Sequence, residues 1–212
     1  MAAQWYDRDW PIPAELAVLS QRKLRPGATV LDAGAHQGLV AMLLARMVTP
    51  SGTVVAVEAC PRNVEIARKN CALNDISNVQ VLHAAVGESA GSIRFTPTIN
   101  GQVASDKEWA TVEVPSVTID ALAERYGTPD VLFVDVEGYE VQALNGSRRS
   151  LETGPDCFVE VHVGCGLEKF GGTVEMLTNC FPKGYEFLFL DPDSNMPTAP
   201  LHKRFYLIAS RR

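Results

Sequence analysis

The sequence predicts an α/β protein: a single doubly wound, mostly parallel seven-stranded sheet with an antiparallel last strand. Short β-rich runs alternate along the chain with segments of helical periodicity, which is the pattern of parallel strands joined by crossover helices. The last two β-rich runs, YEFLFL and RFYLIAS, have no helical segment between them, so we expect them to pair antiparallel. The 212 residues, 46% of them hydrophobic, suffice for one core and predict one domain.

The first half of the chain carries three of the expected strands. Apolar runs bounded by turn residues predict strands within 28–34, 53–58 and 78–87. The segment 39–48, LVAMLLARMV, is apolar almost all round, as a helix packed inside a protein is. A second helix is expected to start at Pro61, because the first turn of a helix does not need the N–H that proline lacks.

The second half begins with a hairpin excursion at 91–116, in which we expect Pro115 to end the second β-run. Its polar loop, which includes Asn100, Gln102 and Ser105, either folds over a ligand or is a surface loop. The remaining expected elements are a helix over 118–126, a strand over 130–136, a helix over 139–145, a strand over 156–163 and a helix with Val174, Leu177 and Phe181 on one face.

Composition and charge argue against nucleic acid and membranes as partners of this protein. The net charge is −6, and no Lys/Arg cluster exceeds Arg148–Arg149 and Arg211–Arg212, which disfavours nucleic acid. The five cysteines have no C-x-x-C spacing, as in proteins of a reducing compartment. The chain shows neither a signal peptide nor an apolar run of membrane-spanning length. We therefore expect a cytoplasmic protein with an N-terminal helical segment over 1–25 and its main domain over 26–212, and neither nucleic acid nor membrane as partner.

A glycine-rich turn follows the first expected strand and is the first candidate for a ligand site. It reads DAGAHQG, with Asp32, Gly34 and Gly38 in a D-x-G-x-x-x-G spacing and with Ala35 and His36 between the glycines. This spacing differs from the G-x-G-x-x-G of nicotinamide and flavin proteins. Gly34 suits a tight turn and Gly38 a close helix start, and the Asp32 carboxylate can accept hydrogen bonds from a ligand. Read alone, the spacing also fits a purely structural turn.

The ends of the next two strands extend this candidate site. Glu58 closes the second strand, where an acid can accept hydrogen bonds from both ribose hydroxyls of an adenosine. The alternative is an acid at a strand end in contact with solvent. Ala59 follows Glu58, and Ala84 and Ala85 follow the third strand, where small side chains leave room for an adenine ring.

The chain resembles the FkbM-type family of S-adenosylmethionine-dependent methyltransferases, which have the Rossmann-like class I methyltransferase fold. The resemblance extends from Val30 to the end of the fifth strand, and its most specific part is the run from Pro129 to Gly146. Where the family's commoner first turn has Val and Asn, this chain has Ala33 and His36. The motifs that carry the resemblance are DAGAHQG, VEACPRN, HAAVGE, VPSVTIDAL, PDVLFVDVEGYEVQALNG and PDCFVEVH.

The resemblance implies S-adenosylmethionine as cofactor and methyl transfer to a hydroxyl of a small molecule, such as a secondary metabolite or a sugar. It also implies that the fourth strand lies beside the first, with Asp135 opposite Asp32. Acids there suit a cofactor that carries a sulfonium and an ammonium group, so Asp135 is also expected to bind the cofactor. The open face over the cofactor could be covered by a large substrate or by a second subunit, which makes a homo-oligomer possible.

Four ionisable residues are expected to converge over the cofactor pocket, and three of them, Asp135, Glu160 and His162, are the expected catalytic residues. Asp135 and Glu137 are two residues apart, and so are Glu160 and His162 on the next strand, so each pair shares a face if the chain is extended. We expect Asp135 near the methyl group, with Glu160 and His162 as base and orienting partner. Glu137 is either a substrate contact or an acid at the helix entry, and His162 is either a base or a hydrogen-bonded histidine of the core or its rim. Glu140 is expected to offset the helix dipole.

Three alternatives stay open. An Asp/Glu/Glu/His set also resembles divalent-metal ligation, but no compact ligand motif is present, so we expect no metal. A nucleotide-dependent oxidoreductase is disfavoured by the glycine spacing. A cofactor-binding module without turnover is the remaining alternative, because a fold and a cofactor site do not establish catalysis.

Overall fold

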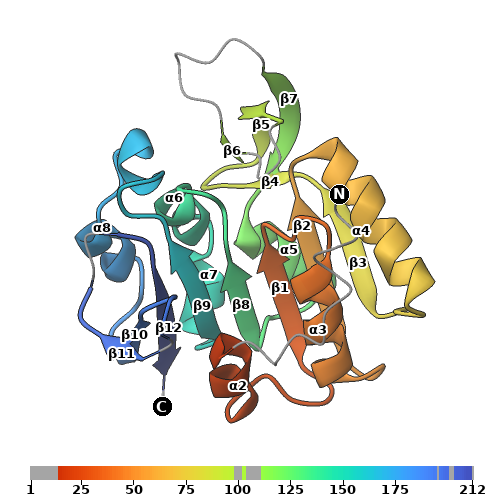
Figure 1. The fold of residues 1–212 in the computed structure, drawn as a ribbon, viewed down its shortest axis with the longest axis horizontal. Helices are drawn as coiled ribbons and strands as arrows, with labels where there is room; N and C mark the ends of the chain where they lie inside the picture. Colours follow the sequence, from red (N-terminus) through yellow and green to blue (C-terminus); the bar gives the residue numbers. More distant parts are fainter. Residues whose placement is uncertain (1–13, 98–101, 104–110, 195, 201–202, 212) are drawn as a thin grey trace.

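The computed structural model describes residues 14–97, 102–103, 111–194, 196–200 and 203–211 (Figure 1). Its main sheet has the strand order β11-β10-β12-β9-β8-β1-β2-β3. The strands β1, β2, β3, β8 and β9 are parallel, and β12 is antiparallel to both β9 and β10. This confirms the predicted fold class. One difference is an eighth strand, β11, which comprises only two residues and pairs with β10.

The strands agree closely with the sequence pattern. The main-sheet strands are β1 Thr29–Ala33, β2 Thr53–Glu58, β3 Val79–His83, β8 Val131–Val134, β9 Asp156–Val161, β10 Tyr185–Leu190, β11 Pro197–Thr198 and β12 Phe205–Arg211. The helices are α2 Ala14–Ser20, α3 Leu39–Val48, α4 Pro61–Leu73, α5 Ile119–Tyr126, α6 Glu140–Asn145, α7 Arg148–Glu152 and α8 Val174–Asn179, with a 3₁₀ turn η1 at Leu167–Phe170. The short elements α7 and η1 have no counterpart among the elements expected from the sequence.

Alternating residues of the strands face two different cores. Along β1, Val30 packs with α2 and α3, whereas Leu31 packs with α5, α6 and α7 on the other face. Val54 and Val55 of β2 divide in the same way. Helices therefore cover both faces of the sheet (Figure 1), which explains why its strands read as continuous apolar runs.

A second, smaller sheet rises above the carboxyl ends of the parallel strands (Figure 1). It has the order β4-β7-β5-β6, with β4 Ala85–Val86, β5 Gly91–Thr96, β6 Gln102–Val103 and β7 Val112–Val117. The expected third strand over 78–87 is thus divided between two sheets. The prediction that Pro115 ends its strand is wrong, because β7 continues to Val117. The neighbouring strand β4 pairs with β7 only at Ser116 and Val117, so it requires no N–H at position 115.

The N-terminal segment contributes one helix to the described structure. Leu16 and Leu19 of α2 are fully buried, and they pack with α3 on one face of the main sheet. Within the described residues, no helix combines the length and the apolar character that crossing a membrane requires. Of the cysteines, Cys60, Cys71 and Cys157 are buried, whereas Cys165 is exposed.

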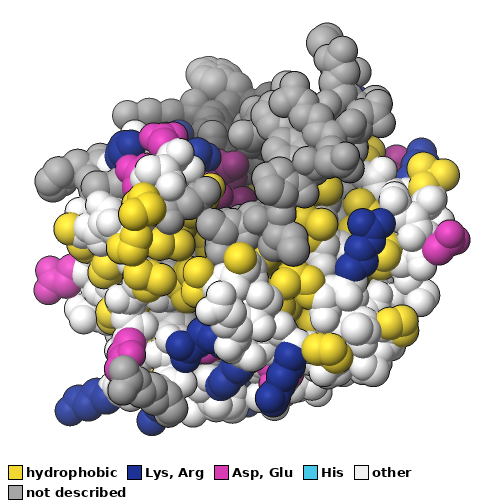
Figure 2. Space-filling model, turned by 60° about the horizontal axis from the view of Figure 1, so that its bottom comes forward, with side chains coloured by type: hydrophobic (Ala, Val, Ile, Leu, Met, Phe, Trp, Pro, Cys, Tyr) yellow, Lys and Arg dark blue, Asp and Glu magenta, His cyan; other side chains and the backbone are white. Residues whose placement is uncertain are grey.

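Figure 2 brings the bottom of the molecule forward. Apolar side chains reach the surface there, and the basic side chains stand in separate groups among them. The exposed large apolar residues of the described chain include Phe187 of β10 and Met176 of α8.

Candidate active site

The glycine turn after β1 is built against the end of β8. Gly34 has a φ of +94°, and a Cβ atom at this position would lie 1.7 Å from the main-chain oxygen of Asp135. The Asp135 N–H donates to the oxygen of Ala33 at 2.9 Å. Only glycine allows this approach, so the tight turn expected at position 34 is confirmed. The register differs from the expectation: Asp32 lies opposite Phe133, and Asp135 therefore lies level with Gly34, two residues beyond.

The rest of the turn leads directly into α3. Gly38 is the N-cap of α3, with a φ of +84°, and its N–H donates to the oxygen of Ala35 at 2.8 Å. A Cβ at position 38 would lie 3.1 Å from the Cβ of Ala67, so this glycine lets α3 start close to α4. His36 has a φ of +48°, a left-handed conformation that is uncommon for a residue other than glycine.

Glu58 holds two segments of the candidate cofactor site together. Its side chain is 6% exposed. Its Oε2 accepts from the N–H of His36 at 2.8 Å, and its Oε1 accepts from the N–H of Cys60 at 2.7 Å. Each carboxylate oxygen can accept a second hydrogen bond, so Glu58 can also bind hydroxyl groups while it fixes the backbone.

Asp32, at the end of β1 just before the same turn, is buried, and one of its carboxylate oxygens has no partner among the described residues. It is 1% exposed, and its Oδ2 has no hydrogen bond to any residue that the structure describes. Burial, with a further contribution from the charge of Glu58, raises the pKa of the Asp32 carboxyl to about 7. A buried acceptor without a donor needs an explanation, and a cationic ligand above the turn supplies one. S-adenosylmethionine carries such charges, so the site fits this cofactor.

We expect Asp32→Asn to stabilise the cofactor-free protein and to weaken cofactor binding. The folded protein binds the Asp32 proton more tightly than the unfolded chain, because the pKa is about 7 instead of 3.8. The wild type should therefore lose stability as the pH rises from 4 to 7 by an amount on the order of 4 kcal/mol, and the Asn variant should not. Thermal melts at pH 5 and 8 test the stability, and calorimetric titration with S-adenosylmethionine tests the binding. Equal melting curves of the two proteins at pH 8 would contradict the expectation.

Small residues line the ends of β2 and β3. Ala84 and Ala85 are each 5% exposed, and Ala84 N–H donates to the oxygen of Glu58 at 3.0 Å. The ring of His83 is 3.0 Å from the oxygen of Ala59 through Nε2. The residues expected to surround an adenosine, Glu58, Ala59, Ala84 and Ala85, therefore lie next to one another.

The three expected catalytic residues, Asp135, Glu160 and His162, come together with Glu137 at the ends of β8 and β9. His162 Nε2 lies 3.4 Å from Glu137 Oε2, 3.7 Å from Asp135 Oδ1 and 3.8 Å from Glu160 Oε1. Glu137 is not extended as expected, because it has a φ of +52°. Its turn packs against the segment after β9, where a Cβ on Gly138 would lie 2.4 Å from the carbonyl carbon of Gly166. We call Asp135, Glu137, Glu160 and His162 the acidic cluster.

Glu140 orients His162, a role that the sequence pattern did not indicate. Glu140 is fully buried, and its Oε1 accepts from His162 Nδ1 at 2.8 Å and from the N–H of Gly138 at 2.7 Å. Glu140 does stand in the first turn of α6, as expected of an acid that offsets the helix dipole. Its contact with a residue 22 positions away has no signal in the sequence.

Arg204 is a further residue of the site that the sequence pattern did not indicate. Its Nη1 lies 2.9 Å from Oε1 of Glu160. Tyr206 of β12 pairs with Glu160 of β9, and Arg204 precedes Tyr206 by two residues, so both Arg204 and Tyr206 face the same side. This relation becomes visible only when the register of β9 and β12 is known.

The carboxylates around His162 favour a positive charge on its imidazole. Burial alone would lower the pKa of the imidazole, but the hydrogen bond with Glu140 and the neighbouring carboxylates raise the pKa to about 9. Burial and the charge of Glu160 raise the pKa of the Asp135 carboxyl well above its usual range, and His162 opposes them. Burial likewise raises the pKa of Glu137. The pKa values of three neighbouring groups are thus all shifted by burial and by one another, which is typical of functional sites.

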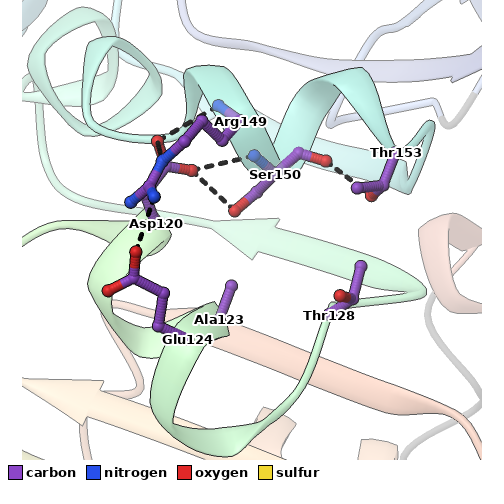
Figure 3. Close-up of a pocket in the computed structure, with 7 residues that line it drawn as sticks. All are labelled: Asp120, Ala123, Glu124, Thr128, Arg149, Ser150 and Thr153. Carbon is purple, nitrogen blue, oxygen red and sulfur yellow. Dashed lines mark hydrogen bonds and ion pairs between the residues drawn. The ribbon is translucent and has the colours of Figure 1, made fainter.

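A pocket elsewhere in the molecule has no such features. It lies between α5 and α7 (Figure 3) and contains none of the predicted site residues. Its polar groups are paired with one another: Arg149 binds Asp120 and Glu124, and Ser150 donates to Asp120 at 2.7 Å. The pocket is therefore a less suitable candidate than the ends of the parallel strands.

Of the expected loop residues, Asn100 and Ser105 lie outside the described part, as does the side chain of Gln102.

The strand order, the glycine turn and the acid at the end of β2 define the class I fold of S-adenosylmethionine-dependent methyltransferases. A family comparison agrees: residues 32–187 match the methyltransferase FkbM domain. The chain belongs to the FkbM methyltransferase family, whose cofactor is S-adenosylmethionine.

Individual relatives are more distant. A protein-L-isoaspartate O-methyltransferase from Aeropyrum pernix is 34% identical over 135 residues, which are 60% of this chain and 50% of that protein. The chain thus matches about half the length of this relative. Among solved structures, the FkbM methyltransferase from Methylobacillus flagellatus has a TM-score of 0.56 at 18% identity, covering 86% of this chain and 43% of that one. A protein from Streptococcus mutans in complex with SAH has a TM-score of 0.58 at 15% identity, covering 96% and 99%. These structures share the fold.

Proposed function

We propose that this protein transfers the methyl group of S-adenosylmethionine to a hydroxyl oxygen of a small molecule. The observation that carries the proposal is the position of the acidic cluster. It stands at the carboxyl ends of β8 and β9, and Asp135 in this cluster contacts the glycine turn of the cofactor site directly. Chemistry at the ends of parallel strands, beside a cofactor site, is the usual arrangement in open α/β sheets.

The cofactor supplies an electrophilic methyl group on a positively charged sulfur. Glu58 accepts hydrogen bonds from the ribose hydroxyls, and Asp32 and Asp135 face the cationic part. Ala84 and Ala85 leave room for the adenine ring. With these contacts the chain orients the donor, and Asp135 holds the acceptor close to the methyl group, which lowers the entropic part of the barrier.

Glu160 accepts the hydroxyl proton. A hydroxyl oxygen becomes more acidic as its bond to carbon forms, so a carboxylate is a sufficient base. Arg204 and His162 both approach Oε1 of Glu160 and fix the side chain. Because both contacts are made by Oε1, we infer that Oε2 of Glu160 receives the proton of the acceptor hydroxyl. His162 is the orienting partner, and Glu140 holds its ring in place.

The charge of the site supports a neutral or weakly cationic small acceptor. Carboxylates of the acidic cluster would repel a polyanion such as RNA. A peptide carboxylate, the acceptor in the name of the Aeropyrum relative, would meet the same repulsion.

The test is transfer of a ¹³C-labelled methyl group to a panel of acceptors. The panel contains sugars, polyols and phenols, with amines, an isoaspartyl peptide and RNA as competitors. We expect a base-stable O-methyl ether on one of the hydroxyl compounds, identified by NMR. An N-methyl product, or a base-labile methyl ester on the peptide, would overturn the oxygen-ether proposal. Cofactor binding without transfer to any member of the panel would favour the binding module.

A further inference from the structure

The space between Asp135, Glu137 and His162 has the features of a cation site. We propose that these three residues bind one divalent transition-metal cation through Asp135 Oδ1, Glu137 Oε2 and His162 Nε2. The proposal goes beyond methyl transfer and reverses the sequence-based expectation that no metal binds. One ligand atom from each residue lies within 4.8 Å of the others.

The distances fit ligands of a shared ion better than direct hydrogen bonds. His162 Nε2 is 3.4 Å from Glu137 Oε2 and 3.7 Å from Asp135 Oδ1. No hydrogen bond joins Nε2 to either oxygen, although all three groups are polar and close. Ligands at about 2.1 Å from a tetrahedral metal lie about 3.4 Å from one another. Small side-chain adjustments would therefore complete the coordination.

In this space a buried carboxylate oxygen and a histidine nitrogen face each other without a hydrogen bond. The side chain of His162 is 4% exposed, and its hydrogen bond is made by Nδ1 alone, so Nε2 faces the carboxylates without one. Asp135 is partly exposed, but its Oδ1 is buried and has no hydrogen bond to any described residue. Buried polar atoms normally have partners, and a single cation would satisfy both atoms.

Glu140 is placed as the outer partner of a metal-bound histidine. Such a histidine usually donates its second ring N–H to a carboxylate, which fixes the tautomer and the ring orientation. Glu140 accepts from Nδ1 at 2.8 Å and is itself fixed by the N–H of Gly138 at 2.7 Å. Nε2, the nitrogen that faces Asp135 and Glu137, is thereby left as the ligand atom.

The ligand set indicates the kind of metal. One imidazole and two carboxylates suit zinc or manganese. Calcium and magnesium prefer sites in which all the ligands are oxygens. Three protein ligands leave a position open, as in catalytic zinc sites. Glu160 lies 3.8 Å from Nε2 and is paired with Arg204, so it remains outside the ligand set and can still accept a proton. An acceptor hydroxyl at the open position would lose its proton more readily.

The experiment is calorimetric titration of chelator-treated full-length protein with ZnCl₂ and, separately, MnCl₂, without cofactor or acceptor. We expect one equivalent to bind with a micromolar or lower Kd. His162→Ala should abolish this binding, and Glu137→Gln should weaken it at least tenfold. His83→Ala is the matched control, because His83 is exposed and stands outside the cluster. Circular dichroism verifies the fold of each variant, and Glu137→Gln serves as the test if His162→Ala does not fold.

A second measurement reports on the geometry. Co²⁺ in the site should give the visible absorption of a four- or five-coordinate ion, and Glu140→Gln should lower Co²⁺ affinity about 10- to 100-fold without removing a ligand. Absence of binding, binding that Glu137→Gln leaves unchanged, or equal loss in His83→Ala would overturn the metal site. Because no methyl transfer is measured, these outcomes are independent of the proposed function.

Discussion

Glu160→Gln is expected to lower the rate of methyl transfer by about 10²- to 10⁴-fold, the usual contribution of a general base. Glutamine has the same shape and can still accept from Arg204, but its amide cannot take up the hydroxyl proton. The affinity for S-adenosylmethionine should change by less than about threefold, since Glu160 lies on β9 and its ion pairs are with His162 and Arg204.

The measurement is the single-turnover rate at saturating cofactor, with the acceptor found in the panel. Glu175→Gln is the control, because this residue is an exposed acid on α8. If Glu160→Gln keeps more than half of the wild-type rate, another member of the acidic cluster accepts the proton of the acceptor hydroxyl. A parallel loss of cofactor affinity would instead show that Glu160 supports the cofactor site.

Glu58→Ala is expected to weaken cofactor binding by at least about 100-fold. The variant loses the ribose contacts and also the charge-assisted hydrogen bonds to the N–H groups of His36 and Cys60, at 2.8 and 2.7 Å. Such bonds contribute about 1.5–3 kcal/mol each, and their loss leaves the two N–H groups without an acceptor. The turn would then be free to move away from the cofactor.

Calorimetric titration with S-adenosylmethionine and with its demethylated product measures this loss, and NAD serves as the negative ligand. Glu65→Ala, an exposed acid on α4, is the control. Glu58→Gln separates the two roles, because its amide oxygen can replace only one of the two acceptors. Unchanged binding by Glu58→Ala would mean that Glu58 acts only on the backbone and that the ribose lies elsewhere.

Most of the fold could be predicted because each element carries a local signal. The helix over 39–48 has the same bounds in the structure, and the tight turn at Gly34 is marked by a residue type that no other can replace. Errors arose where a neighbouring strand decides the outcome. Proline has no N–H to donate and therefore usually ends a strand. Because β4 pairs with β7 only at Ser116 and Val117, no N–H is needed at position 115, and β7 continues.

The candidate site was predictable in part for the same reason. Strand ends can be read from the sequence, so Asp32, Glu58, Asp135 and Glu160 could be placed at one edge of the sheet. The contacts of Glu140 and Arg204 could not, because each depends on packing between elements far apart in the chain.

By itself, the sequence determined the order of strands and helices, the family, and which residues stand at the carboxyl ends of the strands. These properties follow from local periodicity and turn chemistry, which short segments carry. Only the tertiary structure decided that Glu140 binds Nδ1 of His162, that Glu137 turns toward Nε2 of the same ring, and that Asp135 Oδ1 is left without a donor. Distances of 3–4 Å between side chains depend on strand register and on close approaches such as Gly138 against Gly166, and no segment of sequence carries that information alone.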